Sequence, residues 1–341
     1  MQTPHPFTKI LLPFDGSPSA RMAVRFAAAM APGKGGAERH LTLLYVAGGS
    51  YLARHLQNVD LRVVRLERTA EWQRIREHRL EREIRPLLAE GKDILVRSGF
   101  QGVIEVQIEE GKIGERIMHV AQQGEYTAII MGRRGLSPFK ELILGSVTQY
   151  TLAHAQGLTV VMVGHGDETP AESPRFPLLL PVDGSEPSLE AVRQAVQIVQ
   201  GWRQSPGPIE IMNVVDLALL GQMLTDEAQV LIDEGSRALG AAQEILAQAG
   251  LKTVVEEKLV SGIPPQVIVQ EITAKRCPLV LMGSVGHAVL SRLLLGSVTH
   301  SVLHLAPQPT IGVVYPKLAS VPPETGLARH NDQKKASPNP R

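Results

Sequence analysis

The chain alternates short, uninterrupted apolar runs with longer segments in which apolar residues recur every three or four positions. In the first half, the runs predict strands at Ile10–Phe14, Leu41–Val46, Ala128–Met131 and Thr159–Val163, with one more at either Asp93–Ser98 or Val103–Ile108. In the second half, they predict strands at Leu178–Val182, Glu210–Val214, Val254–Leu259, Leu279–Met282 and Thr310–Val314. Helical spacing lies between them, as at Ser188–Val199 and Glu227–Ala249. Because strands without polar alternation suit a parallel sheet covered on both faces, the pattern predicts a doubly wound α/β fold.

The two halves are copies of one domain-sized unit. The stretches "KILLPFDGSPSARMAVRFAAAM", from Lys9, and "PLLLPVDGSEPSLEAVRQAVQIV", from Pro177, share an apolar run, a proline, Asp-Gly-Ser and Ala-Val-Arg. Asp15 matches Asp183 at an offset of 168 residues, and Gly132 matches Gly283 at an offset of 151. The first copy is therefore 17 residues longer between these positions. A repeat of this length indicates a duplicated domain and not a solenoid.

The additional length of the first copy lies in a segment rich in strong helix formers, residues 51–91. Its apolar residues fall roughly along one helix face: Trp72, Ile75, Leu80, Ile84 and Leu87. Glu81 precedes Arg85 by four residues, which is the favourable order for a surface pair on a helix. Acidic residues alternate with the many arginines, so we interpret the segment as a solvated helix that could cover or narrow a first ligand site.

Composition sets the outer limits of the interpretation. A length of 341 residues suits about two domains at ~150 residues each. The formal net charge of +1 predicts no overall attraction to nucleic acid or membrane. The single cysteine, Cys277, suits a reducing compartment, and no run of about 18 uncharged apolar residues predicts a membrane span. We therefore expect a cytoplasmic protein.

Polar and proline-rich stretches place the boundaries. We expect a first domain at residues 1–165, a linker at 166–176, a second domain at 177–316 and a tail at 317–341. The tail has several prolines and no apolar periodicity, so it is expected to be disordered.

One motif is present twice. "MGRRGLSPFKELILGSVT", from Met131, and "MGSVGHAVLSRLLLGSVT", from Met282, both follow a predicted strand and precede a helical segment. Each has the spacing Gly-x2-Gly-x9-Gly-Ser. Glycine lets a ligand approach bare backbone, and a helix N-terminus presents unpaired N–H groups with partial positive charge. A strand, a glycine-rich loop and a helix start together predict a phosphate site.

Neighbouring residues extend this prediction. Ser146 and Ser297 could cap the helices or donate a hydroxyl to phosphate. Asp15 and Asp183, at the ends of the first strands, would reach the same crevice and suit ribose hydroxyls or a metal on the phosphates. The alternative is that the glycines only make tight turns and the serines only cap.

Other site signatures are absent from the sequence. There is no G-x-x-x-x-G-K-[ST] P-loop, no G-x-G-x-x-G after a strand, no H-E-x-x-H and no G-x-S-x-G. Eleven histidines are present, but none forms a Cys/His cluster with metal spacing. No general base is placed near the loops by sequence, so the pattern favours binding over turnover and predicts no catalytic residue and no metal held by the protein alone.

At these residues the chain resembles the universal stress protein family, in its tandem, ATP-binding form. The resemblance runs from Lys9 to Pro316 and rests on "LLPFDGS" and "LLLPVDGS", on "LLYV" and "IMNV", and on both glycine loops. It implies two Rossmann-like domains, each with a five-stranded parallel sheet in the order 3-2-1-4-5. It also implies that ATP or another adenine nucleotide binds, with or without Mg²⁺, and that fifth strands pair, here within one chain as a pseudo-dimer.

The resemblance also implies the site residues. Val46 and Val214 would meet adenine through their backbone, the aspartates would contact ribose or metal, and the loops would hold phosphates. In the first copy the residues are Pro13, Asp15, Val46, Met131, Gly132, Arg133, Gly135, Gly145, Ser146 and Val147. In the second copy they are Pro181, Asp183, Val214, Met282, Gly283, Gly286, Gly296, Ser297 and Val298.

The two loops differ between their glycines. The first carries Arg133, Arg134 and Lys140, and the second carries only Arg292, with His287 mostly neutral near pH 7. We therefore expect the first site to bind the triphosphate more tightly and with stronger salt dependence.

We expect a regulatory nucleotide-binding protein of the stress response, with an unknown protein partner and a further homodimer left open. A slow ATPase or a nucleotidyl-transfer enzyme of the wider α/β group remains an alternative, as does a scaffold without ligand.

Overall fold

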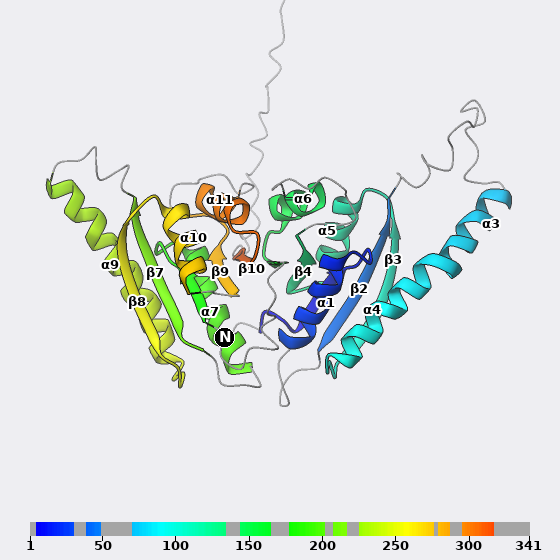
Figure 1. Cartoon of the computed structure of the whole chain (residues 1–341), viewed down its shortest axis with the longest axis horizontal. Helices are drawn as coiled ribbons and strands as arrows, with labels where there is room; N and C mark the ends of the chain where they lie inside the picture. Colours follow the sequence, from blue (N-terminus) through cyan, green and yellow to red (C-terminus); the bar gives the residue numbers. More distant parts are fainter. Residues whose placement is uncertain are drawn as a thin grey trace, which may run out of the picture.

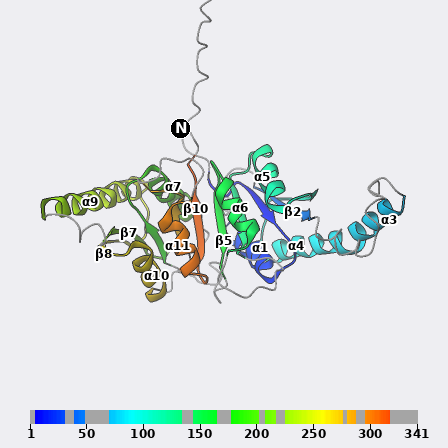
Figure 2. The same ribbon diagram turned by 90° about the horizontal axis from the view of Figure 1, so that it is seen from above.

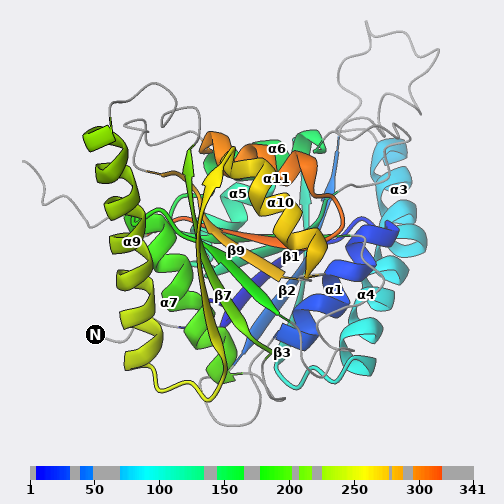
Figure 3. The same cartoon turned by 60° about the vertical axis from the view of Figure 1, so that its left-hand side comes forward.

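The computed structural model describes residues 5–30, 39–48, 70–133, 144–164, 177–201, 207–216, 225–275, 279–286 and 295–316. In these residues ten strands form one sheet with helices on both faces (Figures 1 and 3). The first copy contributes β1 (Lys9–Pro13), β2 (His40–Ala47), β3 (Val103–Glu110), β4 (Ala128–Gly132) and β5 (Thr159–Val163). The second contributes β6 (Leu178–Pro181), β7 (Ile209–Asp216), β8 (Val255–Gly262), β9 (Leu279–Gly283) and β10 (Thr310–Val314).

The helices follow the strands in the same order in both copies. The first copy has α1 (Pro18–Met30), α3 (Ala70–Arg79), the π-helical turn η2 (Leu80–Ile84), α4 (Arg85–Arg97), α5 (Ile113–Gln123) and α6 (Ser146–His154). The second has α7 (Glu186–Gly201), α9 (Thr225–Gln248), α10 (Pro264–Ala274) and α11 (Ser297–Leu305).

Each copy is a doubly wound domain. The strand order is β3-β2-β1-β4-β5 in the first and β8-β7-β6-β9-β10 in the second, and neighbours within each copy run parallel. The expected order 3-2-1-4-5 is therefore confirmed twice. Of the two alternatives for the third strand, Val103–Ile108 is correct, since residues 93–98 lie at the end of α4 and just beyond it. The apolar run Ile94–Val96 continues a helix that begins before it, and Val96 is exposed.

The two domains join edge to edge. Strands β5 and β10 pair antiparallel, with Met162 opposite Ile311 and Val160 opposite Val313. They lie side by side at the centre of the molecule (Figures 1 and 2). Both strands are buried throughout. The predicted intrachain pairing is confirmed, and an apolar edge that would attract another chain is closed within this one.

The sheet buries both of its faces. Along β1, Ile10 and Leu12 point to one face and Leu11 to the other, as the two-residue period of a strand requires. The first face is covered by α1, α4, α7 and α9, and the second by α5, α6, α10 and α11. The strand ends, which no helix covers, are therefore the places where a sheet of this kind can bind a ligand.

The long helical segment of the first copy packs as its pattern predicts. Ile84 is buried, and Leu80 and Leu87 pack against the same core. The predicted pair also forms, with Arg85 Nε 3.1 Å from Glu81 Oε1. The side chains of Trp72 and Ile75 lie outside the described residues.

Among the described helices, none combines the length and the apolar character that a membrane-spanning helix needs.

Candidate functional site

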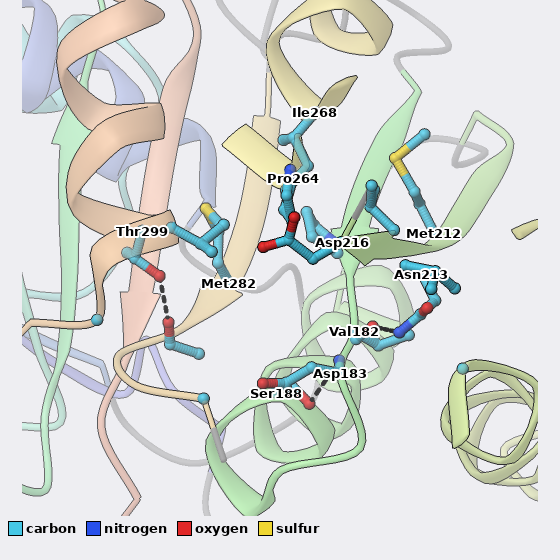
Figure 4. A pocket seen from close by; sticks show the side chains of 18 of the residues that line it. Val182, Asp183, Ser188, Met212, Asn213, Asp216, Pro264, Ile268, Met282 and Thr299 are labelled. Carbon is cyan, nitrogen blue, oxygen red and sulfur yellow. Dashed lines mark hydrogen bonds between the residues drawn. The ribbon is translucent and has the colours of Figure 1, made fainter. Parts of the chain in front are cut away.

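A cavity of about 340 Å³ opens at the carboxyl ends of β6, β7 and β9, beside the N-terminus of α11 (Figure 4). This volume falls in the range of small-molecule sites. All nine residues predicted for the second copy line it: Pro181, Asp183, Val214, Met282, Gly283, Gly286, Gly296, Ser297 and Val298. The structure thus brings together residues that are up to 117 positions apart in the sequence. Their contact with a ligand stays a prediction.

The Asp-Gly-Ser turns fix the two aspartates in the same way. Ser185 N donates to Asp183 Oδ1 at 3.0 Å, and Ser17 N donates to Asp15 Oδ1 at 3.0 Å. The glycine between them has a φ of +84° at Gly184 and +76° in the first copy, a conformation that other residues rarely adopt. Each turn therefore holds its carboxylate at the end of the first strand of its copy.

The glycines of the loops have different structural roles. A Cβ on Gly132 would lie 2.6 Å from the carbonyl carbon of Ser19, and one on Gly283 would lie 2.7 Å from Ser188 N. These two glycines let the strand end touch the helix after the Asp-Gly-Ser turn. A Cβ on Gly145 would meet nothing nearer than 3.7 Å. Tight packing therefore explains the first glycine of each motif without a ligand, but it does not explain the last glycine of the first motif.

The helix starts differ from the expectation for the serines. Gly145 and Gly296 are the N-cap residues of α6 and α11, and no side chain caps either helix. The predicted capping role of Ser146 and Ser297 is wrong, because each is the first helical residue and is exposed. The first N–H groups of an α-helix have no acceptor within it. Both helix starts are therefore left without a side-chain cap, and Ser297 at the start of α11 lines the cavity.

Two threonines that the sequence analysis missed secure these helix starts. Thr299 Oγ1 donates to Gly283 O at 2.8 Å, and Thr148 Oγ1 donates to Arg133 O at 3.3 Å. Both side chains are buried. The signal was present in the sequence, because "GSVT" ends both motifs. These bonds tie the first turn of each helix back to the end of the preceding strand.

The structure corrects the prediction for Arg133. Its side chain is only 4% exposed and points into the seam between the domains, where Nη1 donates to Leu303 O at 2.9 Å and Nη2 to Pro309 O at 3.2 Å. A guanidinium held by two carbonyls of the other domain does not face the crevice. We therefore withdraw its side chain as a phosphate ligand of the first site.

Several predicted residues lie outside the described residues. They are Gly135, Arg134 and Lys140 of the first loop and His287 and Arg292 of the second. The remaining first-copy residues, Pro13, Asp15, Val46, Met131, Gly132, Gly145, Ser146 and Val147, lie at the ends of β1, β2 and β4 and at the start of α6. Their places in the fold match those of the second-copy residues.

One corner of the crevice differs between the copies. In the second, Asn213 Nδ2 donates to Val182 O at 2.8 Å, and a Cβ on Gly235 would lie 2.5 Å from Asn213 Oδ1. The pairing of β1 with β2 and of β6 with β7 makes Tyr45 the counterpart of Asn213. The offset of 151 residues makes Ile84 the counterpart of Gly235.

In the first copy the larger side chains of Tyr45 and Ile84 occupy the places of Asn213 and Gly235. The Tyr45 hydroxyl accepts a hydrogen bond from Arg79 Nη2 at 3.2 Å, and Ile84 is buried. The second copy has a small amide and a glycine at these places, and both line its cavity. Local signals for them were weak, since Asn213 is one of three polar residues in "IEIMNVVD" and Gly235 is one of two glycines in α9. The helical segment of the first copy that corresponds to α9 thus carries a larger side chain at the corner that the second copy leaves open.

Three carboxylates line the cavity of the second copy: Asp183, Asp216 and Glu234. No group of three or more metal-binding side chains occurs in the part of the chain that the structure describes. Mg²⁺ commonly binds through one or two carboxylates together with substrate phosphates. Asp183 beside the glycine loop fits that arrangement.

Comparison with known proteins settles the family. The model of the universal stress protein family matches residues 6–163 and again residues 175–313, which together make up most of the chain. The chain belongs to the universal stress protein family.

Other universal stress proteins are among the known proteins that this chain resembles. A universal stress protein of Methanocaldococcus jannaschii is 30% identical over 142 residues, covering 41% of this chain and 82% of that protein. The crystal structure of a universal stress protein from Archaeoglobus fulgidus covers 91% of this chain and 98% of its own, at 20% identity and a TM-score of 0.60. A universal stress protein solved in complex with cAMP covers 42% of this chain and 98% of its own, at 25% identity and a TM-score of 0.32. As a universal stress protein, this chain carries two copies of the family unit in one continuous sheet.

Proposed function

We propose that this universal stress protein binds an adenine nucleotide, ATP in the first instance, at both domains and acts as a regulatory binding protein. The observation that carries the proposal is the convergence of all nine second-copy residues around one cavity. The uncapped N-terminus of α11 forms one end of that cavity and would receive the phosphates. Asp183 would accept hydrogen bonds from ribose or hold Mg²⁺ on the phosphates.

The base would lie at the other end of the cavity. Val214 follows Asn213 near the end of β7, and the apolar side chains of Met212, Ile268 and Met282 line the same space. A flat aromatic base suits such a lining, and backbone groups at the strand end can meet its polar edge. The first domain offers Val46 at the equivalent place, so we propose a second site there.

We propose binding and not turnover as the main activity. Asp183 Oδ1 already accepts hydrogen bonds from Ser185 N and Ser185 Oγ, which holds the carboxylate in the turn. A carboxylate satisfied in this way is a weak general base. The expected result is phosphate release slow enough that bound ATP can be recovered unchanged.

The test uses exposed positions where substitution should not disturb the fold. Ser146→Asp with Ser297→Asp places a carboxylate at the first residue of both helices. It suits the helix dipole but repels phosphate. Calorimetric titration with ATP should show two sites in the natural chain and none in this variant. The matched control, Ser146→Asn with Ser297→Asn, is nearly isosteric and uncharged and should still bind. Equal ATP affinity in the Asp and Asn variants would refute the proposed sites.

A further inference from the structure

The C-terminal ends of α6 and α11 are each held by a residue of the opposite domain. Arg133 Nη1 donates to Leu303 O in the last turn of α11, and the Tyr315 hydroxyl donates to Leu152 O in the last turn of α6. Leu152 and Leu303 are both the seventh residue of a nine-residue helix. The two carbonyls are therefore equivalent, although the donors are different residue types.

Each donor is also connected to the glycine loop of its own domain. Arg133 directly follows Gly132, and Arg133 O accepts the hydrogen bond from Thr148 Oγ1 at the start of α6. Tyr315 directly follows Val314, and Val314 O accepts from Ser284 N at 2.9 Å. Ser284 O in turn accepts from Gly296 N at 2.8 Å, at the start of α11. Arg133 is thus linked to the start of α6 by one hydrogen bond, whereas Tyr315 is linked to the start of α11 through Val314, at the end of β10, and Ser284.

These hydrogen bonds link the two domains in both directions. The N-terminus of each helix lies at the candidate phosphate site of its own domain. The C-terminal turn of α11 accepts from Arg133, which begins the first loop, and that of α6 accepts from Tyr315, which is linked to the second loop through Val314 and Ser284. A nine-residue helix is about 13 Å long and moves as a rigid body. A displacement at the N-terminus of α11 therefore reaches Leu303 O and, through it, Arg133. The same holds for α6, Leu152 and Tyr315.

The contacts of the Arg133 guanidinium indicate a specific link between the two domains and not only general packing. The Arg133 guanidinium is buried and donates to Pro309 O as well as to Leu303 O. Carbonyls in the last turn of a helix carry partial negative charge, which stabilises a cation there. The planar fork of arginine can satisfy both carbonyls at once, whereas lysine presents a single ammonium.

We propose that Arg133 and Tyr315 couple the two nucleotide sites, so that ATP in one domain tightens ATP binding in the other. This rests on the proposed function. A ligand that fixes the N-terminus of one helix also fixes its C-terminal turn, to which Arg133 or Tyr315 of the other domain is bonded, so the second ligand has less to order. By linkage the effect must be the same in both directions.

The experiment measures the coupling factor on the full chain by calorimetry with ATP. Ser146→Asp leaves only the second site, and Ser297→Asp leaves only the first. The product of the two stepwise association constants of the natural chain, divided by the product from these single-site variants, gives the factor. We expect a value of about five or more.

The same measurement in two further backgrounds tests the residues. Arg133→Met keeps an unbranched side chain without donors, and Tyr315→Phe removes one hydroxyl. Each should lower the factor to near one, and Arg97→Met, at an exposed position at the end of α4, should leave it unchanged. If Arg133→Met does not fold, Tyr315→Phe alone decides. A factor of one in the natural chain, or a factor that neither variant lowers, overturns the coupling while ATP binding stands. Absence of ATP binding in the natural chain overturns the proposed function and the coupling together.

Discussion

The carboxylate of Asp183 lies directly against Gly286, so that a Cβ on this glycine would overlap with Asp183 Oδ2. One residue ends the first strand of the second domain and the other is the second glycine of its loop, 103 positions later. The contact joins the candidate ribose or metal ligand to the candidate phosphate loop.

Gly286→Ala should displace the Asp183 carboxylate and weaken ATP binding at the second site by about tenfold, which corresponds to ~1.4 kcal/mol. Calorimetry in the Ser146→Asp background isolates this site. A double-mutant cycle with Asp183→Ala supplies the check. Once the carboxylate is gone, adding Gly286→Ala should weaken ATP binding little further. Additive losses in the cycle would show that the alanine acts elsewhere.

The first loop allows a separation of stability from binding. Gly132→Ala would bring a Cβ to 2.6 Å from the Ser19 backbone, and overpacking of this kind costs about 1–3 kcal/mol. Gly145→Ala meets nothing nearer than 3.7 Å and should cost only the N-cap preference for glycine over alanine, about 0.5 kcal/mol. Chemical denaturation of both variants measures the difference. Equal losses of stability would contradict the packing role assigned to Gly132.

The repeat and the apolar runs were enough to predict the fold. Uninterrupted strands alternating with helices predicted the doubly wound α/β domains, whereas the order 3-2-1-4-5 was implied by the family resemblance. The pairing of β5 with β10 agrees with two apolar edges that one chain can close. The third strand was left open between residues 93–98 and 103–108 because "ILV" is apolar in a strand and on a helix alike, and periodicity over three residues cannot separate the two.

The site was predictable where the motif repeats and not where the copies differ. Asp183, Gly283, Gly286, Gly296 and Ser297 have counterparts in the first copy, and all of them line the cavity. Arg133 was misread because its neighbours in sequence are loop glycines, whereas its bonding partners, Leu303 and Pro309, lie 170 or more positions away. A contact at that separation leaves no local pattern.

Acid should weaken the fold through His5. Burial, the largest cause, lowers the pKa of His5 from 6.5 to about 4, while a hydrogen bond with the Gln197 backbone raises it and Arg39 lowers it further. Between pH 6.5 and about 4, His5 is protonated in the unfolded chain but neutral in the folded chain. The free energy of unfolding therefore falls as the pH drops through this range. We expect a loss of about 2 kcal/mol, since His5 keeps some solvent contact.

Denaturation at several pH values measures this slope. His5→Gln should flatten it between pH 6.5 and 4, because the titrating group is gone. His78→Gln, at an exposed position on α3, is the control and should keep the slope of the natural chain. An unchanged slope in His5→Gln would assign the acid sensitivity to other groups.

The two sites should differ in ATP affinity even though the Arg133 side chain does not face the first site. The first loop still carries Arg134 and Lys140, and the second carries Arg292. ATP titration of Ser297→Asp and Ser146→Asp at low and high salt compares the isolated sites. We expect the first to bind more tightly and to lose more affinity as salt rises, since exposed cations are screened. Equal affinity and equal salt dependence would show that the additional cations do not reach the phosphates.

The last prediction concerns the corner that only the second domain leaves open. Gly235→Ala would place a Cβ 2.5 Å from Asn213 Oδ1, which must move and so lose the hydrogen bond from Nδ2 to Val182 O. Because Val182 directly precedes Asp183, the aspartate should shift and ATP affinity at the second site should fall several-fold. Replacing a helical glycine by alanine alone stabilises by about 0.5–1 kcal/mol, whereas the overlap and the lost bond cost about 1–3 kcal/mol. The net result should be destabilising. Gly240→Ala lies in the same helix with nothing within 4 Å of the new Cβ, so it should stabilise the chain and leave ATP binding unchanged. If both substitutions stabilise equally, Asn213 is not held by the space at Gly235, and the corner does not position Asp183.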